Sequence, residues 1–151
     1  KNLDPMQKPI TVFLLLIFFT LTSCDIKPQP INYGEDACHF CKMTIVDKQH
    51  AAQIVTQKGK AFKFDAVECM LNHLKDIDTS EVALYLVTDY MDPGILIDAT
   101  KSQYIISENI PSPMGEFLSS VKSEDVVLQL QQDKEGSIYS WKEILKHFKV
   151  K

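Results

Sequence analysis

The sequence contains no arginine, so all sixteen of its basic residues are lysines. The planar guanidinium group of arginine is the favoured side chain for phosphate and nucleic-acid recognition. The lysines alternate with acidic residues and do not form a basic stripe, and the formal net charge is −4. The composition therefore argues against a nucleic-acid-binding protein, and we expect no nucleic-acid partner.

The sequence also lacks an apolar stretch long enough to cross a bilayer as a helix. The apolar run near its N-terminus covers residues 10–21, whereas a membrane-spanning helix needs about 20 residues. This run follows Lys8 and leads through Leu-Thr-Ser into Cys24, the pattern of a short secretory signal. The four residues Leu21-Thr22-Ser23-Cys24 resemble the lipobox of bacterial lipoproteins. This resemblance implies cleavage before Cys24 and a diacylglycerol group on its sulfur. An uncleaved buried helix is the alternative, and Met6 begins a more typical signal than Lys1 does.

We therefore divide the chain into a lipoprotein signal peptide (1–23), a tether (24–36) containing Pro28 and Pro30, and a globular domain (37–151). Each methylene of an attached acyl chain adds about 0.8 kcal/mol of membrane affinity. We expect a lipoprotein held on the extracytoplasmic, periplasmic face of a membrane. The sequence leaves open which membrane this is.

The cysteines do not pair off. With Cys24 lipidated, Cys38, Cys41 and Cys69 remain, and three cysteines cannot all form disulfides with one another. At least one thiol is left over, and a free thiol outside the cytoplasm is a candidate ligand or nucleophile. The sequence also has too few cysteines and histidines at finger spacing for a structural zinc site.

The most informative motif is Cys38-His39-Phe40-Cys41-Lys42-Met43. Its thiols and thioether are soft ligands, which select Cu(I), zinc or iron–sulfur centres over hard cations. If residues from 41 onward form a strand, the side chains of Cys41 and Met43 point the same way and make a two-sulfur clamp. The alternative is a redox-active or structural disulfide between Cys38 and Cys41, with Met43 filling the core.

The element pattern indicates an α+β fold with two similar halves of β-β-α-β type, at about residues 37–90 and 91–151. We expect short strands at 43–46, 51–56, 61–64, 82–87, 95–98, 103–107 and 138–139, with the 95–98 and 103–107 strands paired. We expect turns at 47–50, 57–60 and 92–94, and helices after Asp65, at 124–132 after Ser123, and after Ser140.

The first of these helices receives a detailed prediction. Asp65 is expected to cap it, and Glu68 to complete an acidic capping box. Its buried face should carry the residues spaced i, i+3, i+4 and i+7, namely Val67, Met70, Leu71 and Leu74. Cys69 and His73 lie on a different side, where a solvent-facing position or packing against the other half of the domain is favoured over a second metal pair.

Several of these features occur together in one chain. They are the lipobox, the tether, His39-Phe40-Cys41-Lys42-Met43, Phe64-Asp65 before a helix, Ile97-Asp98-Ala99, and Ser112-Pro113-Met114-Gly115. Together they resemble the NosL family of nitrous-oxide-reductase accessory lipoproteins. The resemblance implies a fold of two similar α/β halves, shared with organomercurial lyases. It also implies a copper chaperone and not an enzyme, which holds Cu(I) and helps a membrane transporter assembly supply the copper–sulfur centre of nitrous oxide reductase.

The resemblance also implies which residues bind copper. Cys41 and Met43 match the Cys-x-Met copper motif of the family, and Met114 matches the methionine of its Pro-Met-Gly loop. His39 precedes the motif cysteine and is expected to ligate copper or tune the site. Cys38 is included among the candidate ligands. For both Cys38 and Cys69 the role of an auxiliary ligand, a disulfide partner or a free thiol stays open.

The competing function is that of a thiol–disulfide oxidoreductase, or of a lyase-like thiol enzyme, using Cys38, Cys41 and Cys69. A redox-active CxxC pair is usually activated by a helix N-terminus. Here the pair precedes a predicted strand, which counts against that function. Asp65 and Glu68 are the acids that a lyase could use beside its thiols.

Overall fold

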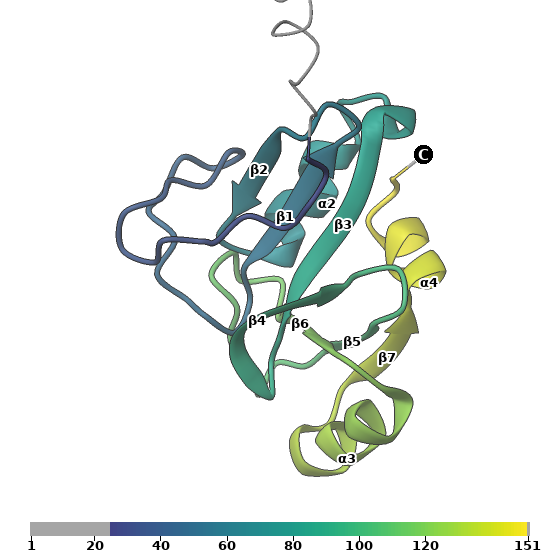
Figure 1. Cartoon of the computed structure of the whole chain (residues 1–151). Helices are drawn as coiled ribbons and strands as arrows, with labels where there is room; N and C mark the ends of the chain where they lie inside the picture. The colour runs from purple at the N-terminus through teal and green to yellow at the C-terminus, as the bar shows by residue number, and fades with distance from the viewer. Residues whose placement is uncertain (1–24, 151) are drawn as a thin grey trace, which may run out of the picture.

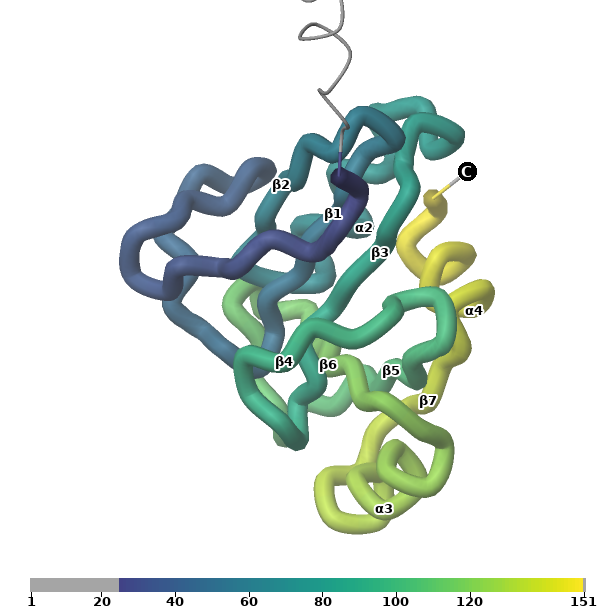
Figure 2. Tube along the Cα trace, in the orientation of Figure 1, coloured from purple at the N-terminus to yellow at the C-terminus, as the bar shows by residue number. Residues whose placement is uncertain are grey.

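A computed structural model describes residues 25–150, which form two antiparallel sheets with helices packed against them (Figures 1 and 2). The first sheet has the order β2-β1-β3-β4, from β1 (Ala52–Thr56), β2 (Ala61–Phe64), β3 (Val82–Asp89) and β4 (Asp92–Asp98). The second has the order β6-β5-β7, from β5 (Gln103–Ile106), β6 (Leu118–Val121) and β7 (Ser137–Ser140). The predicted α+β class is confirmed.

Each sheet is accompanied by its own helices. Helix α2 (Val67–Leu74) packs on β1 and β2, and the short 3₁₀ helix η1 (Thr79–Glu81) leads into β3. Helices α3 (Glu124–Lys134) and α4 (Trp141–His147) pack on β5 and β7. In chain order both sheets begin strand, strand, helix, strand, and the first sheet then adds the further strand β4; the shared order is compatible with two similar halves. The internal repeat stays a prediction.

The two sheets meet where β3 contacts β6. The Tyr90 amide donates to the Ser120 carbonyl (2.8 Å), and the Ser120 hydroxyl donates to the Thr88 carbonyl (2.8 Å). The buried side chains of both sheets then form a shared core, which includes Phe64 and Tyr104. This junction lies beside α2, which also contacts β6.

Three strand predictions were wrong. Residues 43–46 form no strand, and only an isolated bridge joins Thr44 to Ala37. Strand β4 already begins at Asp92, where a turn was expected, and it pairs with β3 and not with the strand at 103–107. Strand β6 was not predicted, because its sequence Leu-Ser-Ser-Val has no apolar alternation. Its serines are buried and hydrogen-bonded, Ser119 to the His50 imidazole (3.0 Å) and Ser120 to β3.

The helix termini were predicted with mixed success. Ser140 caps α4 as expected, in a capping box with Glu143. Helix α2, however, has Ala66 and not Asp65 at its N-cap position, so the predicted acidic capping box of Asp65 and Glu68 is wrong. Both acidic side chains point into the protein instead, where they make the contacts described below.

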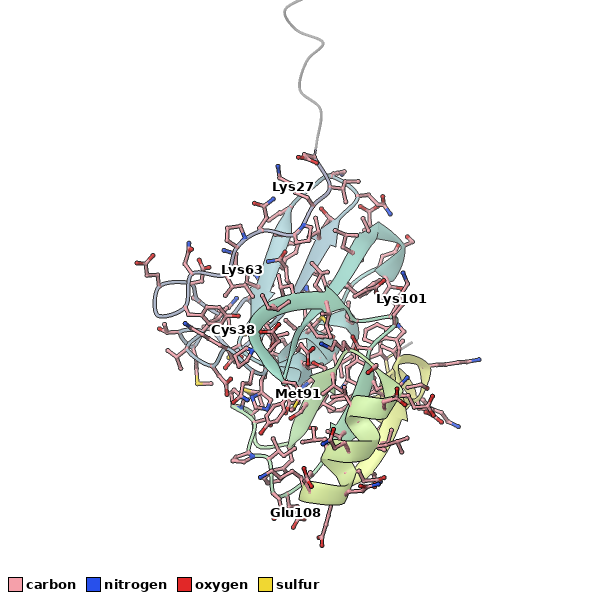
Figure 3. All side chains as sticks on the ribbon, turned by 60° about the horizontal axis from the view of Figure 1, so that its bottom comes forward. Lys27, Cys38, Lys63, Met91, Lys101 and Glu108 are labelled. Atoms are coloured by element: carbon pink, nitrogen blue, oxygen red, sulfur yellow. The ribbon has the colours of Figure 1, made fainter. Side chains whose placement is uncertain are left out.

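The segment predicted as a tether is packed against the first sheet where the structure describes it. The Gln29 amide donates to the buried Gln53 side chain of β1, which donates back to the Gln29 carbonyl (2.8 Å each). Figure 1 shows this segment crossing the sheet, and Figure 3 places Lys27 at the end of the molecule where the described chain begins. The signal peptide and Cys24 lie outside the described residues. Between residues 25 and 150, no helix has both the length and the apolar character needed to cross a membrane.

Candidate metal centre

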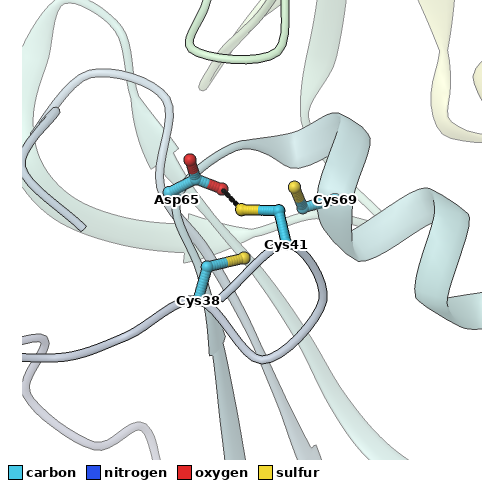
Figure 4. Close-up of side chains that lie close together, drawn as sticks. All are labelled: Cys38, Cys41, Asp65 and Cys69. Atoms are coloured by element: carbon cyan, nitrogen blue, oxygen red, sulfur yellow. Dashed lines mark hydrogen bonds between the residues drawn. The ribbon is translucent and has the colours of Figure 1, made fainter. Parts of the chain in front are cut away.

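Four metal-binding side chains converge at the end of β2, beside α2. The sulfur atoms of Cys38, Cys41 and Cys69 and a carboxylate oxygen of Asp65 all lie within 4.8 Å of one another (Figure 4). They come from three segments, which are the loop 38–43, the residue after β2, and the first turn of α2. We call this group the thiol pocket.

Main-chain hydrogen bonds shape the loop 38–43. The Cys38 amide donates to the Met43 carbonyl (2.7 Å), and the Lys42 amide donates to the Cys38 carbonyl (3.0 Å). Lys42 closes this turn with a left-handed φ of 67°, which is uncommon for a residue with a side chain. The His39 amide donates to the Lys63 carbonyl (2.8 Å), which fastens the loop to β2. The loop thereby holds Cys38 and Cys41 against the pocket.

This geometry corrects the prediction that Cys41 and Met43 share a strand face. The loop is a turn, so the two side chains do not follow the two-residue alternation of a strand. The Cys41 thiol is half-buried and donates to Asp65 Oδ1 (3.4 Å). The Met43 side chain is 49% exposed on the surface.

Cys69 is part of the pocket. Of the two positions predicted for it, the solvent-facing one was wrong, whereas packing against the other half agrees with the contact between α2 and β6. The residue is completely buried, as are Val67, Met70 and Leu71, whose burial was predicted correctly. The helical pattern predicts one buried face, but α2 packs on β1 and β2 and also on β6. A helix covered from two sides buries residues that the pattern assigns to solvent.

The three thiols differ in acidity. A hydrogen bond with the Cys69 thiol lowers the pKa of Cys38 from 9.0 to about 6, against the opposing effect of burial. Burial raises the pKa of Cys41 from 9.0 to about 11. The hydrogen bond to Cys38, together with burial, raises the pKa of Cys69 well above its usual value. At neutral pH the pocket therefore contains one thiolate and two thiols, whose protons an incoming metal must displace.

All three cysteines in the described part of the chain are free thiols. Cys38 and Cys69 are fully buried, while Cys41 is partly accessible. Three sulfur donors with a carboxylate nearby form a set that suits a soft metal ion, because thiolates select Cu(I) and zinc over hard cations.

The predicted thioether Met114 lies in the loop between β5 and β6. Its side chain is partly buried and packs on the same core cluster as Cys41, Cys38 and Cys69. The neighbouring Ser112 hydroxyl donates to Glu68, the residue before Cys69 in α2. The loop that carries Met114 is thus attached to the helix that carries Cys69.

His39 is not among the converging donors. Its ring packs on Phe62 and His73, with ring centroids 4.4 Å and 5.0 Å away, and it lies 6.3 Å from the ring of Phe64. Burial, together with Lys42 and Lys60, lowers the pKa of His39, which favours the neutral form of the ring. A direct ligand role for His39 stays a prediction.

Comparison with known proteins identifies the family. The family model for NosL matches residues 30–148 of the chain. The chain belongs to the NosL family. A curated relative, the copper-binding lipoprotein NosL of Stutzerimonas stutzeri, is 27% identical over 149 residues, covering 89% of this chain and 78% of the relative. The crystal structure of the copper chaperone NosL from Shewanella denitrificans superposes with a TM-score of 0.69 at 19% identity. That match covers 79% of this chain and 96% of the other, and it shows the shared fold.

Membership of the NosL family confirms the resemblance drawn from the motifs. Asp65 and Cys69 complete the thiol pocket. Sequence reasoning gave Asp65 a capping role and left the role of Cys69 open. The count of three unpaired cysteines was the available signal for Cys69.

Proposed function

We propose that this NosL-family protein is a membrane-anchored Cu(I) chaperone that supplies copper for the maturation of nitrous oxide reductase. The observation that carries the proposal is the convergence of three free thiols at one partly accessible point. The names of the two relatives, a copper-binding lipoprotein and a copper chaperone, support the same assignment. One name describes a copper-binding protein and the other a chaperone, which agrees with the expectation that the chain is not an enzyme.

The donor set fits Cu(I) as cargo. Cu(I) prefers soft sulfur ligands, and the pocket offers three of them within 4.8 Å of one another. Two of the sulfurs are fully buried, which protects them from solvent, and the third, Cys41, is partly accessible. Met43 and Met114 are proposed as thioether ligands at the rim, as the family motifs imply.

The unequal burial of the sulfurs suits a protein that must release its cargo. A ligand of the recipient protein can approach the ion from the side of Cys41 and the exposed Met43 and then displace the chaperone's ligands one at a time. A closed four-ligand cage would retain the ion and transfer it slowly. The pocket therefore supports delivery better than permanent storage.

Zinc is the competing cargo, because Asp65 could act as a fourth donor and complete a tetrahedral Cys₃Asp set. The Asp65 carboxylate has another role here, because it accepts a hydrogen bond from the Cys41 thiol. The oxidoreductase alternative has weaker support, because the Cys38–Cys41 pair lies in a turn and not at a helix N-terminus.

Anchoring and delivery complete the proposal. Lipid on Cys24 would hold the protein at the extracytoplasmic face of a membrane, and the word lipoprotein in the name of the Stutzerimonas relative supports the lipid anchor. Nitrous oxide reductase and its associated membrane transporter assembly are the proposed recipients.

An anaerobic titration of the mature, lipidated protein against a colorimetric Cu(I) chelator tests the proposal. We expect one Cu(I) bound per chain, and a strong preference for Cu(I) when Zn²⁺ is offered at the same concentration. The loaded protein should then activate copper-free nitrous oxide reductase, whereas a Cys41→Ser protein should not. Mass spectrometry of the same preparation should find lipidated Cys24 as the first residue. Binding of zinc in preference to Cu(I) would contradict the assignment of the cargo.

A further inference from the structure

A buried carboxylate supports the loop that carries Met114. Glu68 lies in the first turn of α2, immediately before Cys69, and its side chain is fully buried. Its Oε1 atom accepts a hydrogen bond from the Ser112 hydroxyl and a second one from the Leu118 amide (3.4 Å). Ser112 and Leu118 flank the segment that contains Met114, so one oxygen atom joins both ends of that segment to α2.

The Ser112 side chain completes this attachment. Its oxygen donates to Glu68 and accepts from the Phe117 amide (2.9 Å), while its carbonyl accepts from the Gly115 amide (3.0 Å). Phe117 has a left-handed φ of 61°, a conformation that is costly for an aromatic residue. The loop is therefore strained at one end and depends on its hydrogen bonds to keep its shape.

Burial of the Glu68 carboxyl group lowers the stability of the folded protein. Its second carboxylate oxygen, Oε2, is buried without a hydrogen-bond partner among residues 25–150. Burial raises the pKa of this carboxyl group, and a buried polar atom without a partner destabilises the folded protein. An apolar side chain of the same size would avoid that cost, so the carboxyl group is better explained by the loop it holds than by the stability it gives.

We propose that Glu68 is a positioning residue for copper binding, which fixes the Met114 loop relative to the thiol pocket. The inference rests on the proposed function, because it assigns Met114 a place beside the ion. Glu68 belongs to the same helical turn as Cys69, so any shift of α2 moves both groups together. The thioether and the buried thiols thus keep a constant separation.

Two substitutions of the full-length protein separate this role from a purely structural one. Glu68→Gln keeps an oxygen acceptor at the same place, and Glu68→Met keeps the volume but removes the acceptor. Glu116→Gln is the matched control, because Glu116 lies exposed in the same loop. For each variant we would measure amide hydrogen exchange of residues 112–118, the thermal unfolding midpoint, and Cu(I) affinity by chelator competition.

We expect Glu68→Met to speed amide exchange in the loop and to weaken Cu(I) binding by about 10-fold to 100-fold, the usual effect of losing a residue that orients a metal ligand. Its unfolding midpoint should change little, because the buried Leu118 amide loses its acceptor while the unpartnered buried oxygen of Glu68 is removed. Glu68→Gln should retain most of the affinity, and Glu116→Gln should match the unsubstituted protein.

Two results would overturn the inference, and they differ from a failure of the proposed function. An unchanged loop exchange rate in Glu68→Met would show that Glu68 does not hold the loop. Faster exchange with unchanged Cu(I) affinity would show that the position of the loop does not matter for copper. A Glu68→Met protein that unfolds earlier and loses affinity in proportion would indicate a merely structural residue. Failure of the unsubstituted protein to bind Cu(I) would instead reject the proposed function.

Discussion

The two sulfur-bearing loops of this protein are held in place by different means. The loop 38–43 is fixed by main-chain hydrogen bonds within itself and to β2, so its shape does not depend on one side chain. The loop 112–118 is attached to α2 by the Glu68 carboxylate and the Ser112 hydroxyl. The first loop delivers thiols into a buried pocket, whereas the second carries a partly buried thioether.

This difference suggests that the thiol and thioether ligands have different roles in copper binding. Thiolates bind Cu(I) tightly, and a backbone-fixed loop together with a helix holds them at constant separations. Thioethers bind more weakly and need not lose a proton. A thioether on a side-chain-supported loop can therefore stabilise the ion without preventing its release. Substitution of a pocket thiol should accordingly lower the Cu(I) affinity more than substitution of the loop thioether, and the following experiments measure that difference.

The largest effect is expected for Cys69→Ser, which removes a buried sulfur from the pocket. We expect Cu(I) affinity to fall by more than about 100-fold, because loss of a direct ligand should exceed the 10-fold to 100-fold loss seen for residues that only orient one. Chelator competition under anaerobic conditions measures this. Ser80→Ala, at an exposed position in η1, is the control variant and should bind Cu(I) as tightly as the unsubstituted protein. If Cys69→Ser keeps full Cu(I) affinity, Cys69 is a core residue and not a ligand, and the copper site consists of the Cys41–Met43 motif without it.

A smaller effect is expected for Met114→Ala, because only a thioether is lost. We expect Cu(I) affinity to fall by about 10-fold, which corresponds to about 1.4 kcal/mol. Met91→Ala is the matched control, since Met91 is 58% exposed on the β3–β4 turn. The same competition assay applies, and X-ray absorption at the copper edge should show one fewer sulfur neighbour. If the two methionine variants bind copper equally well, the 112–118 loop has no part in the site.

These comparisons also show why the sequence revealed one loop better than the other elements. The motif around Cys41 is local, so its six residues identify soft-metal chemistry without knowledge of the fold. Cys69 is contributed by tertiary packing, because α2 is covered by β6 as well as by β1 and β2. A single helical periodicity cannot reveal that second covering layer.

Asp65 and strand β6 were missed for related reasons. An aspartate before an apolar helical pattern is a good capping signal, but here the backbone begins the helix one residue later, and the carboxylate turns to the Cys41 thiol. The serines of β6 look like loop residues until the partners Thr88 and His50 are known. By contrast, Ser140 was predicted correctly, because a capping box is satisfied entirely within four residues of sequence.

The smallest effect concerns the pH dependence of the metal-free protein. Cys38 has a pKa of about 6 in the folded protein, compared with an ordinary value of 9.0, because Cys69 hydrogen-bonds to its thiolate. A thiol whose pKa is lowered on folding contributes stability that is complete above pH 9 and is lost as the pH falls through 6. Thiolate absorbance at 240 nm should therefore show one group ionising near pH 6, and this step should be absent in Cys38→Ser.

In Cys69→Ser the pKa of Cys38 should rise. The C–O bond of serine is shorter than the C–S bond of cysteine, so the hydroxyl lies farther from the Cys38 sulfur and makes a weaker hydrogen bond to it. A Cys38 that ionises only near pH 9 would mean that the buried thiols do not interact, and the pocket would then lose the thiolate that the first contact with Cu(I) requires.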